Sequence, residues 1–127
     1  PPCVADPCTY PALLSPGGPK RAWVVGYFLA SWTVRAELVA DFVCRLLNHM
    51  QAHGWTRVVP ALRAEDQDMP LLPWIDPENF NPGYVMRGMH LLPKRGGKPE
   101  WQHTQDYWID KDAFPAIDLA DGTLRYG

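Results

Sequence analysis

The residue types best placed for chemistry in this 127-residue chain gather in one short stretch. Ser31 and Thr33 can cap the start of a long helix, and Trp32 lies between them. The first amide groups of a helix have no partner within the helix, and the helix dipole makes that end positive. An exposed helix start therefore favours a negatively charged group. Ala30 and Ser31 are small enough for a flat ring to pack against them, and Gly26 permits a close backbone approach. The same stretch also suits a purely structural cap beside a core tryptophan, and the two interpretations are compatible.

Metal-binding and nucleophilic side chains give weaker patterns. His49 and His53 have the i, i+4 spacing of two metal ligands on a helix, but no third ligand is evident, and cationic groups also suit a helix end. Cys3 and Cys8 could form half a zinc site, but no second pair accompanies them. Cys44 lies in an apolar helical pattern and is expected to be a buried, unreactive thiol. We therefore predict no metal site and no catalytic residue in this chain.

Aromatic side chains recur through the proline-rich second half of the sequence. They are Trp74, Trp101, Tyr107 and Trp108. Such side chains can line a substrate pocket, but in a loop-rich segment they more often pin loops to the main body. Arg87 and Arg95 could meet a phosphate, although only their charge points to one.

The clearest structural element is a helix predicted over residues 33–53. Apolar residues recur there at helical spacing, and Gly54 can end the helix in a left-handed conformation. A continuous apolar run at residues 22–28 is typical of a strand buried on both faces, and it follows an irregular lead-in at residues 1–21. A strand of this kind needs neighbours, so the sequence predicts part of a larger α/β fold, with the missing sheet covering the strand and the apolar helix face.

The later elements are shorter. We predict a strand at 56–59, loops at 63–73 and 94–99, helices at 81–91 and 104–113, and a closing hairpin of residues 117–119 and 123–126 around Asp121-Gly122. The 14 prolines limit the length of every helix and strand after residue 54.

Composition and charge exclude some classes of function. The net charge of −2, without a basic run, gives no support for a nucleic-acid partner. The longest apolar stretch, residues 22–34, is shorter than the roughly 20 residues that a membrane helix needs. The odd number of cysteines and the lack of a signal peptide favour reduced thiols and a cytoplasmic protein.

Four segments in order resemble the FAD- and NADPH-dependent monooxygenases of the Baeyer–Villiger type, within the flavin-containing monooxygenase superfamily. They are residues 26–38 with 43–47, residues 81–87 with 92–94, residues 105–107 and residues 121–126. The resemblance implies an α/β fold, as the C-terminal fragment of a flavoprotein with two dinucleotide domains. It assigns residues 22–59 to the end of the FAD-binding domain, and residues 60–127 to a loop-rich, mostly helical C-terminal extension with a terminal hairpin.

The resemblance also implies an activity and a site. Such an enzyme uses FAD and NADPH to insert one oxygen atom from O2 into a ketone or onto sulfur. The helix start would face the flavin, with Gly26, Ala30, Ser31, Trp32 and Thr33 as the cofactor-binding residues.

The sequence departs from the family in what it lacks. It contains no G-x-G-x-x-G motif, no Phe-Gly-His-Trp fingerprint and no basic run where Ile109 to Pro115 stand. We therefore expect this chain alone to hold neither FAD nor NADPH and to be inactive. Its expected partners are the missing N-terminal FAD- and NADPH-binding domains and a small apolar substrate. The alternative is a free-standing interaction module, or one that binds apolar ligands, derived from such an enzyme.

Overall fold

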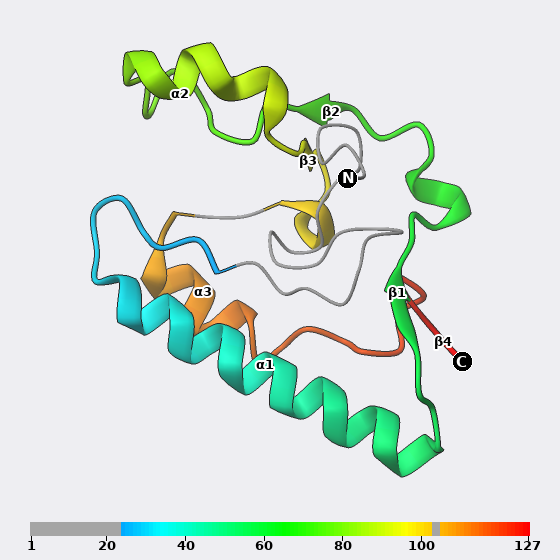
Figure 1. Cartoon of the computed structure of the whole chain (residues 1–127). Coiled ribbons are helices and arrows are strands. Elements are labelled where there is room, and N and C mark those ends of the chain that lie inside the picture. The colour runs from blue at the N-terminus through cyan, green and yellow to red at the C-terminus, as the bar shows by residue number, and fades with distance from the viewer. Residues whose placement is uncertain (1–23, 103–104) are drawn as a thin grey trace.

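One long helix supports the rest of the molecule (Figure 1). The computed structural model describes residues 24–102 and 105–127. The helix is α1, Trp32–His53. After it follow β1 (Val58–Pro60), η1 (Ala64–Asp66), β2 (Leu71–Leu72), α2 (Gly83–Gly88), η2 (Met89–Leu91), β3 (Arg95–Gly96), η3 (Pro99–Trp101), α3 (Tyr107–Ala113) and β4 (Leu124–Tyr126). Helix α3 packs along the first half of α1, whereas α2 lies on the other side of the molecule. The lead-in at 1–21 lies outside the described residues, as do Cys3 and Cys8.

Helix α1 confirms the prediction made from hydrophobic spacing. Its buried apolar side chains, Val39, Phe42, Leu46 and Met50, recur every three or four residues and therefore form one face. Gly54 ends the helix with φ of 69°, the left-handed conformation expected of a terminal glycine.

The strand predicted at residues 22–28 is wrong over its described part. Residues 24–28 form no strand, because no other strand of the described chain runs beside them to share backbone hydrogen bonds. The described residues instead combine helices with two small antiparallel sheets, β1 with β4 and β2 with β3. The chain is thus α/β only in this broad sense.

The predicted closing hairpin is also wrong. Residues 117–119 form no strand, and β4 pairs with β1 instead, with Val58 opposite Tyr126 and Pro60 opposite Leu124. The Asp-Gly turn itself is present: the Asp121 carboxylate accepts a hydrogen bond from the Thr123 amide at 2.9 Å. Pairing with β1 buries Leu124 in the core, which a local hairpin would not achieve. The strand predicted at 56–59 is confirmed with a small shift.

Both segments predicted as loops contain regular structure. Residues 63–73 include η1 and β2, and residues 94–99 include β3. The β2–β3 pairing depends on Gly96, because a Cβ atom there would lie 2.6 Å from Trp101 Cβ and would also overlap Met69. Close packing of a backbone against a core tryptophan thus explains the glycine.

The two shorter helices match their predictions in part. Helix α2 begins at Gly83, and its cap position is Pro82, one residue after the expected cap Asn81. The 3-10 helix η2 forms its last turn. Helix α3 begins at Tyr107, where the Asp106 side chain accepts from the Trp108 amide at 2.9 Å. Residues 103–104 lie outside the described residues.

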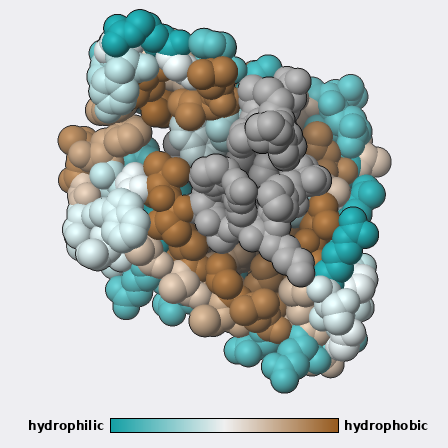
Figure 2. Space-filling model, viewed as in Figure 1, coloured by the Kyte–Doolittle hydropathy of each residue, from teal (hydrophilic) through white to brown (hydrophobic). Residues whose placement is uncertain are grey.

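The apolar face of α1 is covered by the chain's own C-terminal half, so the expectation that only an absent sheet covers it is wrong. Trp101 is fully buried at the centre of this core, and Phe114 meets Phe42 edge to face at 6.4 Å. Other core residues are Met69, Leu119 and Leu124. Hydrophobic side chains also reach the surface on the face drawn in Figure 2 and elsewhere. The exposed ones include Leu29, Trp32, Leu47, Tyr84, Leu91 and Trp108.

A buried carboxylate joins η1 to the segment that carries Trp101. Asp66 accepts from Arg63 Nε at 2.7 Å, from Lys98 Nζ at 2.6 Å and from Trp101 Nε1 at 3.3 Å. The hydrogen bond from Arg63, supported by those from Lys98 and Trp101, outweighs burial and holds the pKa of Asp66 well below its ordinary value of 3.8. This carboxylate is therefore charged whenever the protein is folded near neutral pH.

The packing of Gly96 gives a testable prediction for stability. We expect Gly96→Ala to destabilise the fold by about 1–3 kcal/mol, because the added methyl group overlaps the core. Gly88→Ala is the matched control, since nothing lies within 4 Å of a Cβ there and alanine favours a helix. Urea unfolding measures both, and equal stabilities of the two variants would contradict the packing.

Asp66 gives a prediction for pH dependence. A carboxylate whose pKa is lowered on folding stabilises the fold above its unfolded pKa, and this stability is lost as pH falls below about 4. We expect Asp66→Asn to lower stability at pH 7 and to flatten the fall in stability that begins near pH 5 and continues toward the lowered folded pKa. Asp68→Asn, at an exposed position two residues away, should leave the pH profile unchanged. Unfolding curves at several pH values decide, and identical profiles for Asp66→Asn and the unchanged protein would refute it.

Candidate functional site

The turn of residues 28–33, which leads into α1, lies on the surface. Leu29 is 99% exposed, and the side chains from Ala30 to Thr33 are exposed as well. Ser31 occupies the cap position but makes no capping hydrogen bond to the helix; its Oγ lies 2.7 Å from Thr33 Oγ1 instead. No acidic residue stands in the first turn of α1. The positive end of the helix is therefore not neutralised by its own side chains.

Trp32 folds back onto the chain before the turn. A Cβ atom at Gly26 would lie 3.0 Å from Trp32 Cγ and 3.2 Å from Trp32 Nε1, so the glycine makes room for the indole. The close approach expected at Gly26 thus has an occupant within the chain. Trp32 remains 56% exposed, so over half of its surface is open beside the helix start.

Both ends of the turn bind one buried carboxylate oxygen. Tyr27 donates its hydroxyl to Asp110 Oδ2 at 2.6 Å, and Arg35 Nη1 donates to the same atom at 2.8 Å. All three residues are less than 10% exposed. Burial, together with the hydrogen bond to Asp110, raises the pKa of Tyr27 above its ordinary value, so the hydroxyl stays neutral and donates.

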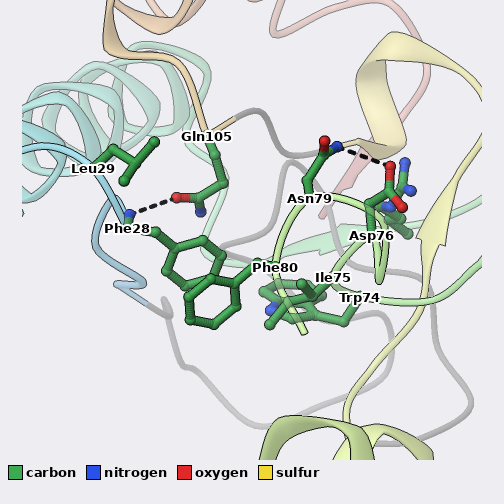
Figure 3. A pocket seen from close by; sticks show the side chains of 9 residues that line it. Phe28, Leu29, Trp74, Ile75, Asp76, Asn79, Phe80 and Gln105 are labelled. Carbon is green, nitrogen blue, oxygen red and sulfur yellow. Dashed lines mark hydrogen bonds between the residues drawn. The ribbon is translucent and has the colours of Figure 1, made fainter. Parts of the chain in front are cut away.

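Gln105 binds the backbone at the start of the turn and just before it (Figure 3). Its Oε1 accepts from the Phe28 amide at 2.9 Å, and its Nε2 donates to the Gly26 carbonyl at 3.5 Å. A side chain on the segment leading into α3 therefore holds both polar groups that flank Tyr27.

A cavity of about 270 Å³ opens beside the turn. Figure 3 shows its lining, in which the rings of Phe28 and Phe80 stack with their centroids 4.0 Å apart. The other lining residues are Leu29, Trp74, Ile75, Asp76, Asn79, Arg95 and Gln105. Asp76 already accepts from Asn79 Nδ2 at 2.9 Å, and Arg95 Nε donates to the Pro73 carbonyl at 2.9 Å. Much of the polar lining is therefore engaged within the protein, and the free wall is largely apolar.

Curated relatives of the chain share one activity in their names. The FAD-containing monooxygenase EthA of Mycolicibacterium smegmatis is 41% identical over 84% of this chain, and EthA of Mycobacterium tuberculosis is 41% identical over 92%. A probable FAD-binding monooxygenase of Acinetobacter baylyi, AlmA, is 32% identical over 85%. The chain is homologous to one segment of the FAD-containing monooxygenases. It spans 21–23% of the length of these relatives. No protein-family model and no solved structure matches it.

The resemblance inferred from the four motifs is thus confirmed at the level of FAD-containing monooxygenases. Two of the motifs meet at the site, since the turn belongs to the first and Gln105 to the third; Phe80, which immediately precedes the second, also lines the cavity. In the described residues of this monooxygenase segment, no helix has both the length and the apolar character to cross a membrane.

The aromatic side chains outside the turn divide between two roles. Trp101 and Trp74 are buried, which confirms the pinning role, and Trp74 also lines the cavity. Tyr107 is half-buried and meets Tyr27 edge to face at 6.2 Å. Trp108 is 72% exposed, so the pinning role is wrong for it. It lies two residues before the buried Asp110, which places it about half a helical turn from that residue.

Cys44 corrects a further expectation, because it is exposed rather than buried. It lies two residues from both Phe42 and Leu46, which places it about half a helical turn from the buried face. Among the described residues, no three potential metal ligands lie together. His53 stacks on Trp55 at 4.4 Å, and its Nδ1 lies 2.8 Å from the His49 carbonyl, so both histidines take part in the packing at the end of α1.

Sequence reasoning missed Arg35 and Asp110. Arg35 carries a charge, yet it is 2% exposed. Its spacing gives the signal: it lies four residues before Val39, in line with the buried stripe. Asp110 likewise lies four residues before the buried Phe114. A charged residue in register with a buried stripe on each of two helices indicates a buried ion pair.

Proposed function

We propose that this chain is the C-terminal part of an FAD- and NADPH-dependent monooxygenase of the Baeyer–Villiger type. Such an enzyme inserts one oxygen atom from O2 into a ketone or adds it to sulfur. The observation that carries the proposal is 41% identity to FAD-containing monooxygenases over 84–92% of the chain. The proposed partners are N-terminal FAD- and NADPH-binding domains, and the proposed location is the cytoplasm.

The turn is the proposed contact with FAD. Ala30, Ser31, Trp32 and Thr33 would pack against the flavin, and Gly26 would keep Trp32 in place beside it. Three features support this fit: the turn is exposed, its side chains at 30 and 31 are small, and no acidic group neutralises the helix start. Bound FAD would supply the oxygen-transfer chemistry, and the first amides of α1 would stabilise negative charge on the ring.

The cavity beside the turn is the proposed place for a small apolar substrate. Its stacked phenylalanines and Trp74 suit an apolar body, and its volume of about 270 Å³ suits a small molecule. Because Phe28 and Leu29 belong both to the turn and to the cavity wall, a substrate held there would lie next to the cofactor.

The cavity also supports the alternative of a free-standing module that binds apolar ligands. The two functions differ in what the complete reading frame encodes. A monooxygenase needs glycine-rich motifs to hold the pyrophosphate of each dinucleotide. This sequence contains no such motif, so the rest of the reading frame would have to encode them.

The product of the complete reading frame provides the first functional prediction. We expect it to purify with bound FAD and to oxidise NADPH with consumption of O2 when a small ketone or sulfide is added. The 127-residue chain alone should lose all flavin absorbance on gel filtration. A complete product that binds no FAD would contradict the monooxygenase proposal, and apolar-ligand binding by such a flavin-free product would favour the alternative.

Ser31 provides a test of the proposed flavin contact. Ser31→Leu puts a bulky group on the turn while leaving α1 intact, since Ser31 is exposed and makes no capping bond. We expect the complete enzyme to retain less FAD or to release hydrogen peroxide on the order of tenfold faster, because a preorganised environment for charge is disturbed. Asn48→Leu, exposed near the other end of α1, is the control. Unchanged flavin content and coupling in Ser31→Leu would leave the turn with a structural role only.

A further inference from the structure

We propose that Asp110, assisted by Gln105, is a positioning residue that sets the place of the turn at residues 28–33. This inference rests on the proposed function, in which that turn faces the cofactor. It assigns to the C-terminal extension a direct part in shaping the flavin site, through contacts to the backbone and side chains at the two ends of the turn.

The first support is that one atom binds both ends of the turn. Tyr27 immediately precedes the turn, and Arg35 follows its last residue by two positions. Their donors reach Asp110 Oδ2 at 2.6 and 2.8 Å. A displacement of α3 that preserves these bonds must carry both ends of the turn with it.

The second support is burial. The Arg35 and Asp110 side chains are 3% and 5% exposed, and breaking a buried ion pair leaves a charge without compensation. The Arg35 guanidinium also lies 5.2 Å from the Tyr27 ring centroid and 5.6 Å from that of Phe114. The pair is therefore fixed by packing as well as by charge, and water cannot readily replace either partner.

The third support comes from Gln105, which acts on the backbone. It accepts from the Phe28 amide and donates to the Gly26 carbonyl, so it replaces the neighbouring strand that this extended segment lacks in the described chain. Gln105 and Asp110 both belong to the region of α3, more than 70 residues after the turn in the sequence.

The turn itself makes few contacts that could fix it. Leu29 is 99% exposed, and Ala30, Ser31 and Thr33 are exposed too. Apart from the stack of Phe28 on Phe80 and the contact of Trp32 with Gly26, the turn is held at its ends, so its position depends on the groups that bind there. Asp110 and Gln105 are thus the residues whose replacement should move the turn without touching the proposed flavin contacts.

The test uses the product of the complete reading frame and three variants. Asp110→Asn removes the charge but keeps the shape, Tyr27→Phe removes one of the two bonds, and Gln105→Ala leaves the ion pair intact. Asp112→Asn, at an exposed position on the same helix, is the matched control. Hydrogen exchange of the Phe28 amide, which donates to Gln105, and of the α1 amides at 36–38 reports how firmly the two ends of the turn are held, and peroxide released per NADPH oxidised reports the effect on the cofactor.

We expect Asp110→Asn to raise exchange of these protected amides about tenfold or more and to raise peroxide release several-fold, with the KM for NADPH unchanged. Tyr27→Phe and Gln105→Ala should give smaller changes of the same kind, and Asp112→Asn none. If Asp110→Asn does not fold, Gln105→Ala still decides. Unchanged exchange in a folded Gln105→Ala or Asp110→Asn variant overturns the proposal.

The two proposals fail in different ways. If the unsubstituted product of the complete reading frame binds no FAD, the monooxygenase function is refuted. Hydrogen exchange still shows whether Asp110 and Gln105 hold the turn. A flavin enzyme whose exchange responds to these variants, but whose peroxide release does not, keeps the monooxygenase function and refutes the positioning role.

Discussion

A single buried carboxylate, Asp110, is the contact on which the arrangement of this chain depends. Placing an ionised group in a protein interior is unfavourable unless a partner of opposite charge and hydrogen-bond donors lie beside it. Arg35 and Tyr27 supply both within 2.8 Å, and losing one partner of such a pair typically costs about 3–5 kcal/mol. Helix α3 can therefore dock on α1 in one register only, and that register carries the segment before α1 with it.

A second buried carboxylate fixes the other half of the molecule by the same principle. Asp66 takes donors from Arg63, Lys98 and Trp101, and so ties the chain after β1 to the segment around η3. Between these two polar sites lies the apolar core, with Trp101 fully buried and the face of α1 against it. Hydrophobic burial supplies the driving force for collapse, whereas the two carboxylates select which segments meet. This division matters in a chain with 14 prolines, because its short helices and strands offer few backbone hydrogen bonds to specify the fold.

The sequence predicted what depends on local pattern and failed where distant segments compete. Helix α1 and its end at Gly54 follow from spacing within the helix, and the family follows from motifs in order. Strand β4 was predicted to pair with its neighbour in sequence, but β1 offered burial of Leu124 in the core, which no local pattern records. Arg35 was given no role, because a charged side chain on a helix is ordinarily exposed, although its register is that of the buried stripe. The turn was proposed from its residue types, whereas the cavity required Phe28, Phe80 and Gln105 to be brought together from three regions.

The shared oxygen of Asp110 also constrains how this sequence can change over evolutionary time. Replacing Arg35 or Asp110 alone removes one member of a buried ion pair, and replacing Tyr27 alone removes one of the hydrogen bonds to the carboxylate. We therefore expect evolution to substitute these three residues together, for example by three apolar residues of similar volume, and single substitutions to be rare. Drift at the neighbouring exposed positions of α3, such as Trp108 and Asp112, carries no such coupling. Among homologues, joint variation at these three sites would mark lineages in which α3 has been re-docked on α1.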